Sequence, residues 1–199
     1  MNDIVNAVLL VYAGLSGLFF LLMLQLQQGL GYSALAAGAS LLPINILMLA
    51  LSPVAGRVAH RIGPRIPMVG GALVAAAGMS LFVRVRPGAN YWTTVAPAAI
   101  VFGLGLSWFV TPLTSVALGA LGEKLAGLAS GVNNAVARLA GLLATAVLPL
   151  AAGLGGLHSL SGPALSAGFA RAMIISAALC VAGGLVAWFT ADHGVSATS

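Results

Sequence analysis

Six long runs of apolar residues follow one another along the chain and limit what it can fold into. Each run has about the 20 mostly apolar residues that a helix needs to cross a bilayer. Strands of a membrane barrel would instead show segments of about ten residues with alternating polarity. We therefore predict an all-α integral membrane protein, with one transmembrane domain over residues 1–199. Its six helices are expected at about residues 4–27, 34–56, 66–84, 91–120, 126–156 and 170–191.

The composition agrees with a surface that faces lipid. Hydrophobic residues make up 60% of the chain and charged residues only 6%, whereas about a quarter of a soluble domain is charged. The net charge of +5 is scattered between the apolar runs, without the basic stripe that nucleic-acid binding requires. We expect membrane lipid as a partner and no nucleic acid. Cys180 is the single cysteine, and no Cys/His spacing predicts a metal site or a cofactor.

The loop between the second and third runs holds the densest basic cluster, Arg57, Arg61 and Arg65. With six helices, both termini lie on the side of this loop. Since cytoplasmic loops are enriched in Lys and Arg, we expect both termini in the cytoplasm. A plain topology-setting loop would explain the arginines as well.

The same loop resembles a signature of the major facilitator superfamily, Gly-x-x-x-Asp-Arg-x-Gly-x-Arg. Gly56, Arg61, Gly63 and Arg65 match it, and His60 stands in the place of the acid. The resemblance implies a gating loop made of these five residues. Histidine cannot supply the anion of the family's charge network, which puts that part of the gating role in doubt.

A later segment, Ala129-Ser130-Gly131-x-x-Asn134 followed by Arg138 and Gly141, resembles the multidrug drug:proton antiporter branch of that superfamily, including its fourteen-helix members. The segment belongs to the C-terminal six-helix half, which consists of 3+3 inverted repeats. The resemblance implies a plasma-membrane exporter of small amphipathic molecules, with substrate bound between two halves.

Several polar residues are candidates for the transport pathway. Asn134, Arg138 and Thr145 fall on one helical face, and we expect them to line the bundle interior, because an intramembrane arginine is costly in lipid. Alternatively, Arg138 extends to the headgroups or the residues only join helices. Three further candidates lie in the first, second and fourth runs, where interhelical hydrogen bonds are the alternative role: Gln27, Asn45 and Thr111.

The acidic residues Asp3, Glu123 and Asp192 all lie at the ends of runs, whereas a proton relay needs an acid within a span. We therefore expect protons to be coupled through a missing N-terminal half, and a second six-helix half or a homodimer as partner. A membrane enzyme would need a nucleophile and base or clustered acids at membrane depth, and the sequence has none. A non-transporting module or an inactive fragment remains an alternative.

Overall fold

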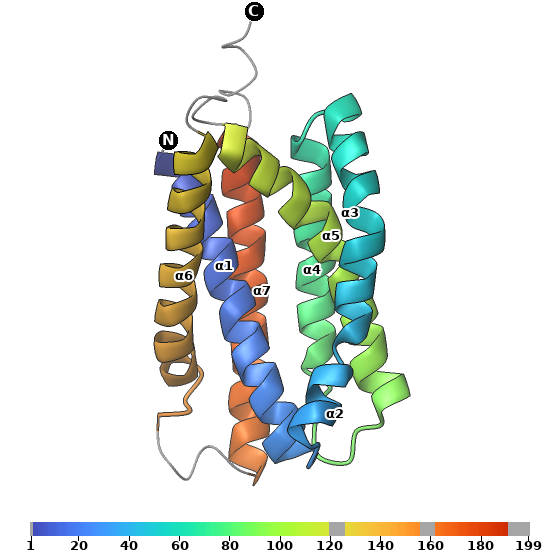
Figure 1. Cartoon of the computed structure of the whole chain (residues 1–199). Coiled ribbons are helices and arrows are strands. Elements are labelled where there is room, and N and C mark those ends of the chain that lie inside the picture. The colour runs from blue at the N-terminus through green and yellow to red at the C-terminus, as the bar shows by residue number, and fades with distance from the viewer. Residues whose placement is uncertain (1, 120–125, 156–161, 191–199) are drawn as a thin grey trace, which may run out of the picture.

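The computed structural model describes residues 2–119, 126–155 and 162–190, and these residues are almost entirely helical. Figure 1 shows the long helices standing side by side as an upright bundle. The elements in chain order are α1 (Asn2–Leu24), the π-helical turn η1 (Gln25–Gly29), α2 (Ala34–Ala39), α3 (Leu42–Ile62), α4 (Arg65–Phe82), the π-helical turn η2 (Tyr91–Val95), α5 (Ala96–Gly119), α6 (Ala126–Ala151) and α7 (Gly162–Thr190).

The long helices alternate in direction, so α1 begins and α7 ends at the same end of the bundle (Figure 1). The turn between α3 and α4 lies there too, and we call this the terminal end. Within the residues that the structure describes, six stretches are long and apolar enough to cross a membrane, which confirms the predicted multi-pass membrane fold. The last helix begins at Gly162, earlier than the expected residue 170, because Pro163 sits in its first turn, where a missing N–H costs no hydrogen bond.

The bundle consists of two three-helix units with the same pairing. In the first unit α1 packs against α6 and α7, and in the second α5 packs against α3 and α4. Since α1 runs away from the terminal end and α5 runs toward it, the two units are inverted relative to each other (Figure 1). Inverted 3+3 repeats produce this matched pairing, since α1 and α5 are the first helices of the two sets of three consecutive spans.

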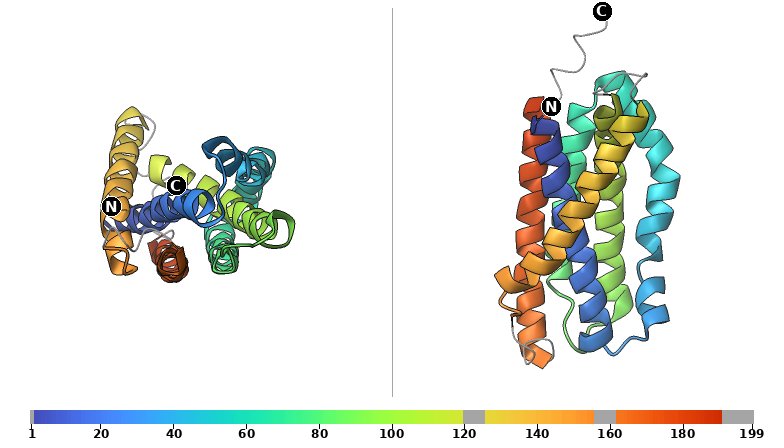
Figure 2. Two further views of the ribbon diagram at one scale, coloured as in Figure 1. Left: turned by 90° about the horizontal axis from the view of Figure 1, so that it is seen from below. Right: turned by 60° about the vertical axis from the view of Figure 1, so that its left-hand side comes forward.

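The units meet through α4 and α7, which form a back layer. Viewed along the bundle, α1 and α5 lie in the middle while α6 and α3 stand at opposite edges (Figure 2). The hydrophobic core lies where the back layer meets the middle helices, and its largest fully buried side chains include Phe82, Phe102, Phe109 and Phe169. The edge helices contribute little to it.

The closest packing of the bundle joins α4 to α5 through glycines. A Cβ added at Gly71 would lie 2.6 Å from the Phe109 nitrogen, and one added at Gly105 would clash with the Ala75 backbone. Small residues let membrane helices approach until their backbones touch. No larger residue fits at these two positions, because the backbone atoms opposite cannot move aside.

Hydroxyl groups within the helices mostly bond to their own helix. Ser107 Oγ donates to the Gly103 carbonyl, and Thr114 Oγ1 donates to the Val110 carbonyl. A hydroxyl in lipid must find an acceptor, and the carbonyl one turn back is always within reach. The proton of each of these two hydroxyls is therefore used within its own helix.

Candidate transport pathway and gating loop

The gating-loop candidates occupy the sharp turn from α3 to α4. Gly63 ends α3 with a φ of 86°, a left-handed conformation that favours glycine, and Arg65 begins α4. His60 and Arg61, in the last turn of α3, are both exposed. The structure thus places the basic loop at the terminal end of the bundle, where a charged turn can reach water or headgroups.

Arg65 differs from the other arginines of the loop because it lies against α7. Its guanidinium carbon lies 5.7 Å from the centre of the Trp188 ring, within the range of a cation–π interaction. This contact ties the start of α4 to the end of α7 and so stabilises the back layer. Arg65 therefore has a structural role here beside any gating role.

Two sequence-predicted sets meet between α3 and α5. A Cβ at Gly56 would lie 3.7 Å from Cγ2 of Thr111, so the pathway candidate on α5 touches the gating candidate on α3. Just beside this contact lies a small cavity of about 200 Å³, lined in part by His60 and Ser115. The structure brings together Gly56, His60 and Thr111 at the terminal end.

The candidates on α6 lie on the surface of the unit. Asn134 and Arg138 are both exposed, which corrects the expectation that they line the interior of this bundle. The reason is that α6 packs mainly against α1, with one close approach at Gly141, where an added Cβ would lie 3.0 Å from Ser16 Oγ. Thr145, half-buried, donates to the carbonyls of its own helix.

Gln27 and Asn45 lie apart from that group. Gln27 is half-buried at the end of α1 away from the termini, and Asn45 is exposed on α3. Because α3 and α6 stand at opposite edges (Figure 2), Asn45 and Arg138 do not meet within this chain. The pathway candidates therefore form no single cluster and instead lie along the two edges and the middle of the bundle.

Gln25 is a site residue that the sequence analysis missed. It is completely buried, and its Nε2 donates to the Val85 carbonyl at 3.0 Å and to Ser166 Oγ at 3.1 Å. One side chain thus joins the end of α1 to the loop after α4 and to α7. Gly29 makes room for it, since a Cβ there would lie 2.8 Å from Nε2. The sequence signal that could have found it is an amide four residues before a glycine, Gln25 and Gly29, at the end of the first apolar run.

The comparisons with known proteins agree with the six-helix membrane fold described above. The sequence model of the Major Facilitator Superfamily matches residues 2–145. The chain is similar to the puromycin resistance protein pur8 of Streptomyces alboniger, with 36% identity over 68% of this chain and 27% of the relative. It is also similar to the tetracenomycin C resistance and export protein of Streptomyces glaucescens, with 33% identity over 71% of this chain and 26% of the relative.

A third relative, the lincomycin resistance protein LmrB of Listeria monocytogenes, is 30% identical over 64% of this chain and 27% of its own length. The chain thus spans about a quarter of the length of the curated relatives it matches. These similarities confirm the predicted resemblance to resistance and export proteins. With a family match over most of its residues and the expected inverted six-helix fold, the chain belongs to the Major Facilitator Superfamily.

Proposed function

We propose that this chain is one half of an exporter of small amphipathic molecules, and that a second six-helix half or a second copy completes the pathway. The observation that carries the proposal is the exposure of the edge helices. Only 22% of the span formed by α2 and α3 and 17% of the α6 span are buried, against 44–56% of the other four. Helices exposed to this degree have a face available for a partner.

The polar residues on these exposed helices support the same proposal. Arg138 lies twelve residues after Ala126, the first residue of α6, which is about 18 Å along the axis at 1.5 Å per residue. That depth is near the middle of a helix that crosses a core of about 30 Å. A charge at this depth is costly in lipid and tends to face protein or water. We infer that Arg138, Asn134 and Asn45 face a pathway shared with the partner.

Energy coupling and orientation complete the proposal. Among the described helices the only acidic residue is Asp3, at the start of α1, so we place the proton-coupling acid in the partner half. The basic α3–α4 turn favours a cytoplasmic terminal end in the plasma membrane. The printed names of the relatives, which concern resistance and export, favour antibiotic-like substrates.

Accumulation of a fluorescent amphipathic dye in cells tests the proposal. The chain is expressed alone and also joined to the remaining length of the pur8 relative, with membrane insertion measured in each case. We expect the joined form to lower dye accumulation and Arg138→Ala to abolish the effect at an unchanged protein level. Arg84→Ala, which replaces an exposed arginine at the other end of the bundle, is the matched control.

The outcomes separate the alternatives. Activity of the chain alone would favour a homodimer over a heterologous second half. If well-inserted protein leaves accumulation unchanged in both forms, the exporter proposal is wrong, and the chain is a non-transporting membrane module. An equal loss with Arg84→Ala and Arg138→Ala would contradict the assignment of Arg138 to the pathway.

A further inference from the structure

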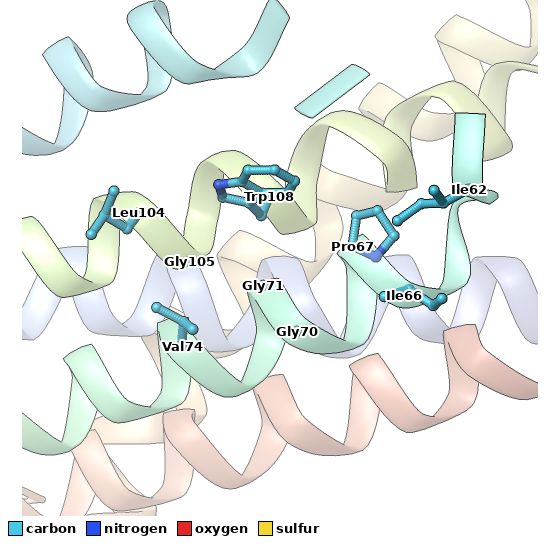
Figure 3. A pocket seen from close by; sticks show the side chains of 9 residues that line it. All are labelled: Ile62, Ile66, Pro67, Gly70, Gly71, Val74, Leu104, Gly105 and Trp108. Atoms are coloured by element: carbon cyan, nitrogen blue, oxygen red, sulfur yellow. The ribbon is translucent and has the colours of Figure 1, made fainter. Parts of the chain in front are cut away.

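An apolar groove of about 410 Å³ runs between α4 and α5 below the end of α3 (Figure 3). Its lining residues come from α3, α4 and α5, and the proposed pathway residues Asn45, Asn134 and Arg138 are not among them. All its side chains are apolar or aromatic. The groove is lined by Ile62, Ile66, Pro67, Gly70, Gly71, Val74, Leu104, Gly105 and Trp108.

Glycines form the floor of the groove and isoleucines form its end. Gly71 and Gly105 lie in the tight backbone contact between α4 and α5, while a Cβ at Gly70 would meet nothing within 4 Å. Ile62 and Ile66 are more than half exposed at the end nearest the α3–α4 turn. From Ile66 to Val74 the groove follows α4 for about 12 Å, along the direction in which lipid chains lie.

Positive charge lies at the same end. Arg61 directly precedes Ile62, and Arg57 lies one turn earlier on the same face of α3; both are exposed. Arg57 Nε donates to the Pro53 carbonyl, and within the described part of the chain neither arginine forms an ion pair. Guanidinium groups at a membrane surface attract anionic headgroups and bind phosphate with charge-assisted hydrogen bonds.

We propose that this groove binds an anionic phospholipid from the leaflet at the terminal end, with one acyl chain over the glycine floor and the phosphate at Arg61 and Arg57. The apolar lining selects an acyl chain, and the arginines select the charge of the headgroup. This inference does not rest on transport activity, because it concerns binding of a lipid that is measured directly.

Trp108 lines the groove and provides a local reporter. In a Trp92→Phe, Trp188→Phe background, Trp108 is the only tryptophan of the chain. The full chain is placed in phosphatidylcholine bilayers that contain phosphatidylglycerol, and one lipid at a time carries brominated acyl chains that quench tryptophan. We expect brominated phosphatidylglycerol to associate at Trp108 at least fivefold more strongly than brominated phosphatidylcholine. The attraction of about one arginine to an anionic headgroup would produce a ratio of this size.

Two variants separate the groove from general contact with lipid. A Cβ at Gly70 would meet nothing within 4 Å, so Gly70→Leu places its side chain in the open space over the floor, and we expect it to remove the preference for phosphatidylglycerol. Gly38→Leu, at another open helical glycine, should keep the preference. Arg61→Gln with Arg57→Gln should lower the preference at least fivefold, whereas Arg84→Gln at the other end should not.

Three results would overturn the proposal. Equal quenching by the two lipids means that the groove holds no anionic lipid. A preference that survives both Gly70→Leu and the arginine changes places the lipid elsewhere. Quenching by neither lipid means that protein covers the groove, for example a second copy of the chain.

Discussion

The α4–α5 contact and the edges of this bundle are packed in different ways. Where α4 meets α5, glycines allow backbone-to-backbone contact and buried phenylalanines fill the space beside it. On α6, large apolar side chains such as Leu142 and Leu150 are more than half exposed. In lipid, an exposed leucine costs nothing in itself, since acyl chains are equally apolar. The difference shows which helices this chain stabilises by itself and which remain open to a partner.

The largest loss of stability is expected from a substitution that forces α4 and α5 apart. Gly105→Val puts side-chain atoms into the Ala75 backbone, and we expect the free energy of unfolding in mixed micelles to fall by about 3 kcal/mol, the upper part of the range for overpacking. Gly70→Val, at an open position on the same layer, is the control. Equal losses for the two variants would show that the contact is not tight.

Removal of the buried amide should have the next largest effect. Gln25→Leu deletes the two hydrogen bonds to Val85 and Ser166, and at about 0.6 kcal/mol for each membrane hydrogen bond, we expect a loss of about 1–2 kcal/mol once the abandoned acceptors are included. Gln28→Leu changes an exposed neighbour in the same π-helical turn. We expect it to leave the unfolding curve in place, and a shift as large as that of Gln25→Leu would refute the role of the amide.

The contact between α4 and α7 should contribute less. Trp188→Leu removes the ring beneath Arg65, and we expect the free energy of unfolding to fall by about 0.5–1 kcal/mol, as for partly exposed cation–π pairs. Trp92→Leu controls for the loss of an exposed tryptophan on η2. The unfolding measurement is repeated at several salt concentrations. If packing of the Trp188 ring contributes to stability in addition to the charge of Arg65, the effect of Trp188→Leu should persist at high salt.

The smallest effect on stability is expected at the edge. Asn45→Ala changes an exposed side chain on α3, and we expect the free energy of unfolding to change by less than about 0.5 kcal/mol. Ile44→Ala, at the neighbouring buried position, should cost clearly more. A large loss with Asn45→Ala would mean that α3 is held by contacts of that face, and it would weaken the proposal that the edge is open to a partner.

The membrane fold could be predicted from the sequence, and the candidate site only in part. The apolar runs predicted six membrane helices, and the loop from Gly56 to Arg65 predicted a turn at the terminal end. Helical periodicity placed Asn134 and Arg138 on one face, but it could not tell whether that face points into the bundle. Gln25 was missed as a site residue because its partners, Val85 and Ser166, lie far away in the sequence.

That this chain enters a membrane as helices follows from its amino-acid sequence alone, because long apolar segments in lipid must satisfy their own backbone hydrogen bonds. The family follows from the sequence too, through short motifs at set spacings. The sequence did not predict that α4 and α7 form the back layer while α3 and α6 stay exposed; this is evident only in the structure. Most of the surface of each helix is apolar, so hydrophobicity alone does not select partners. Close fit between small residues on distant segments, such as Gly71 and Gly105, selects them instead.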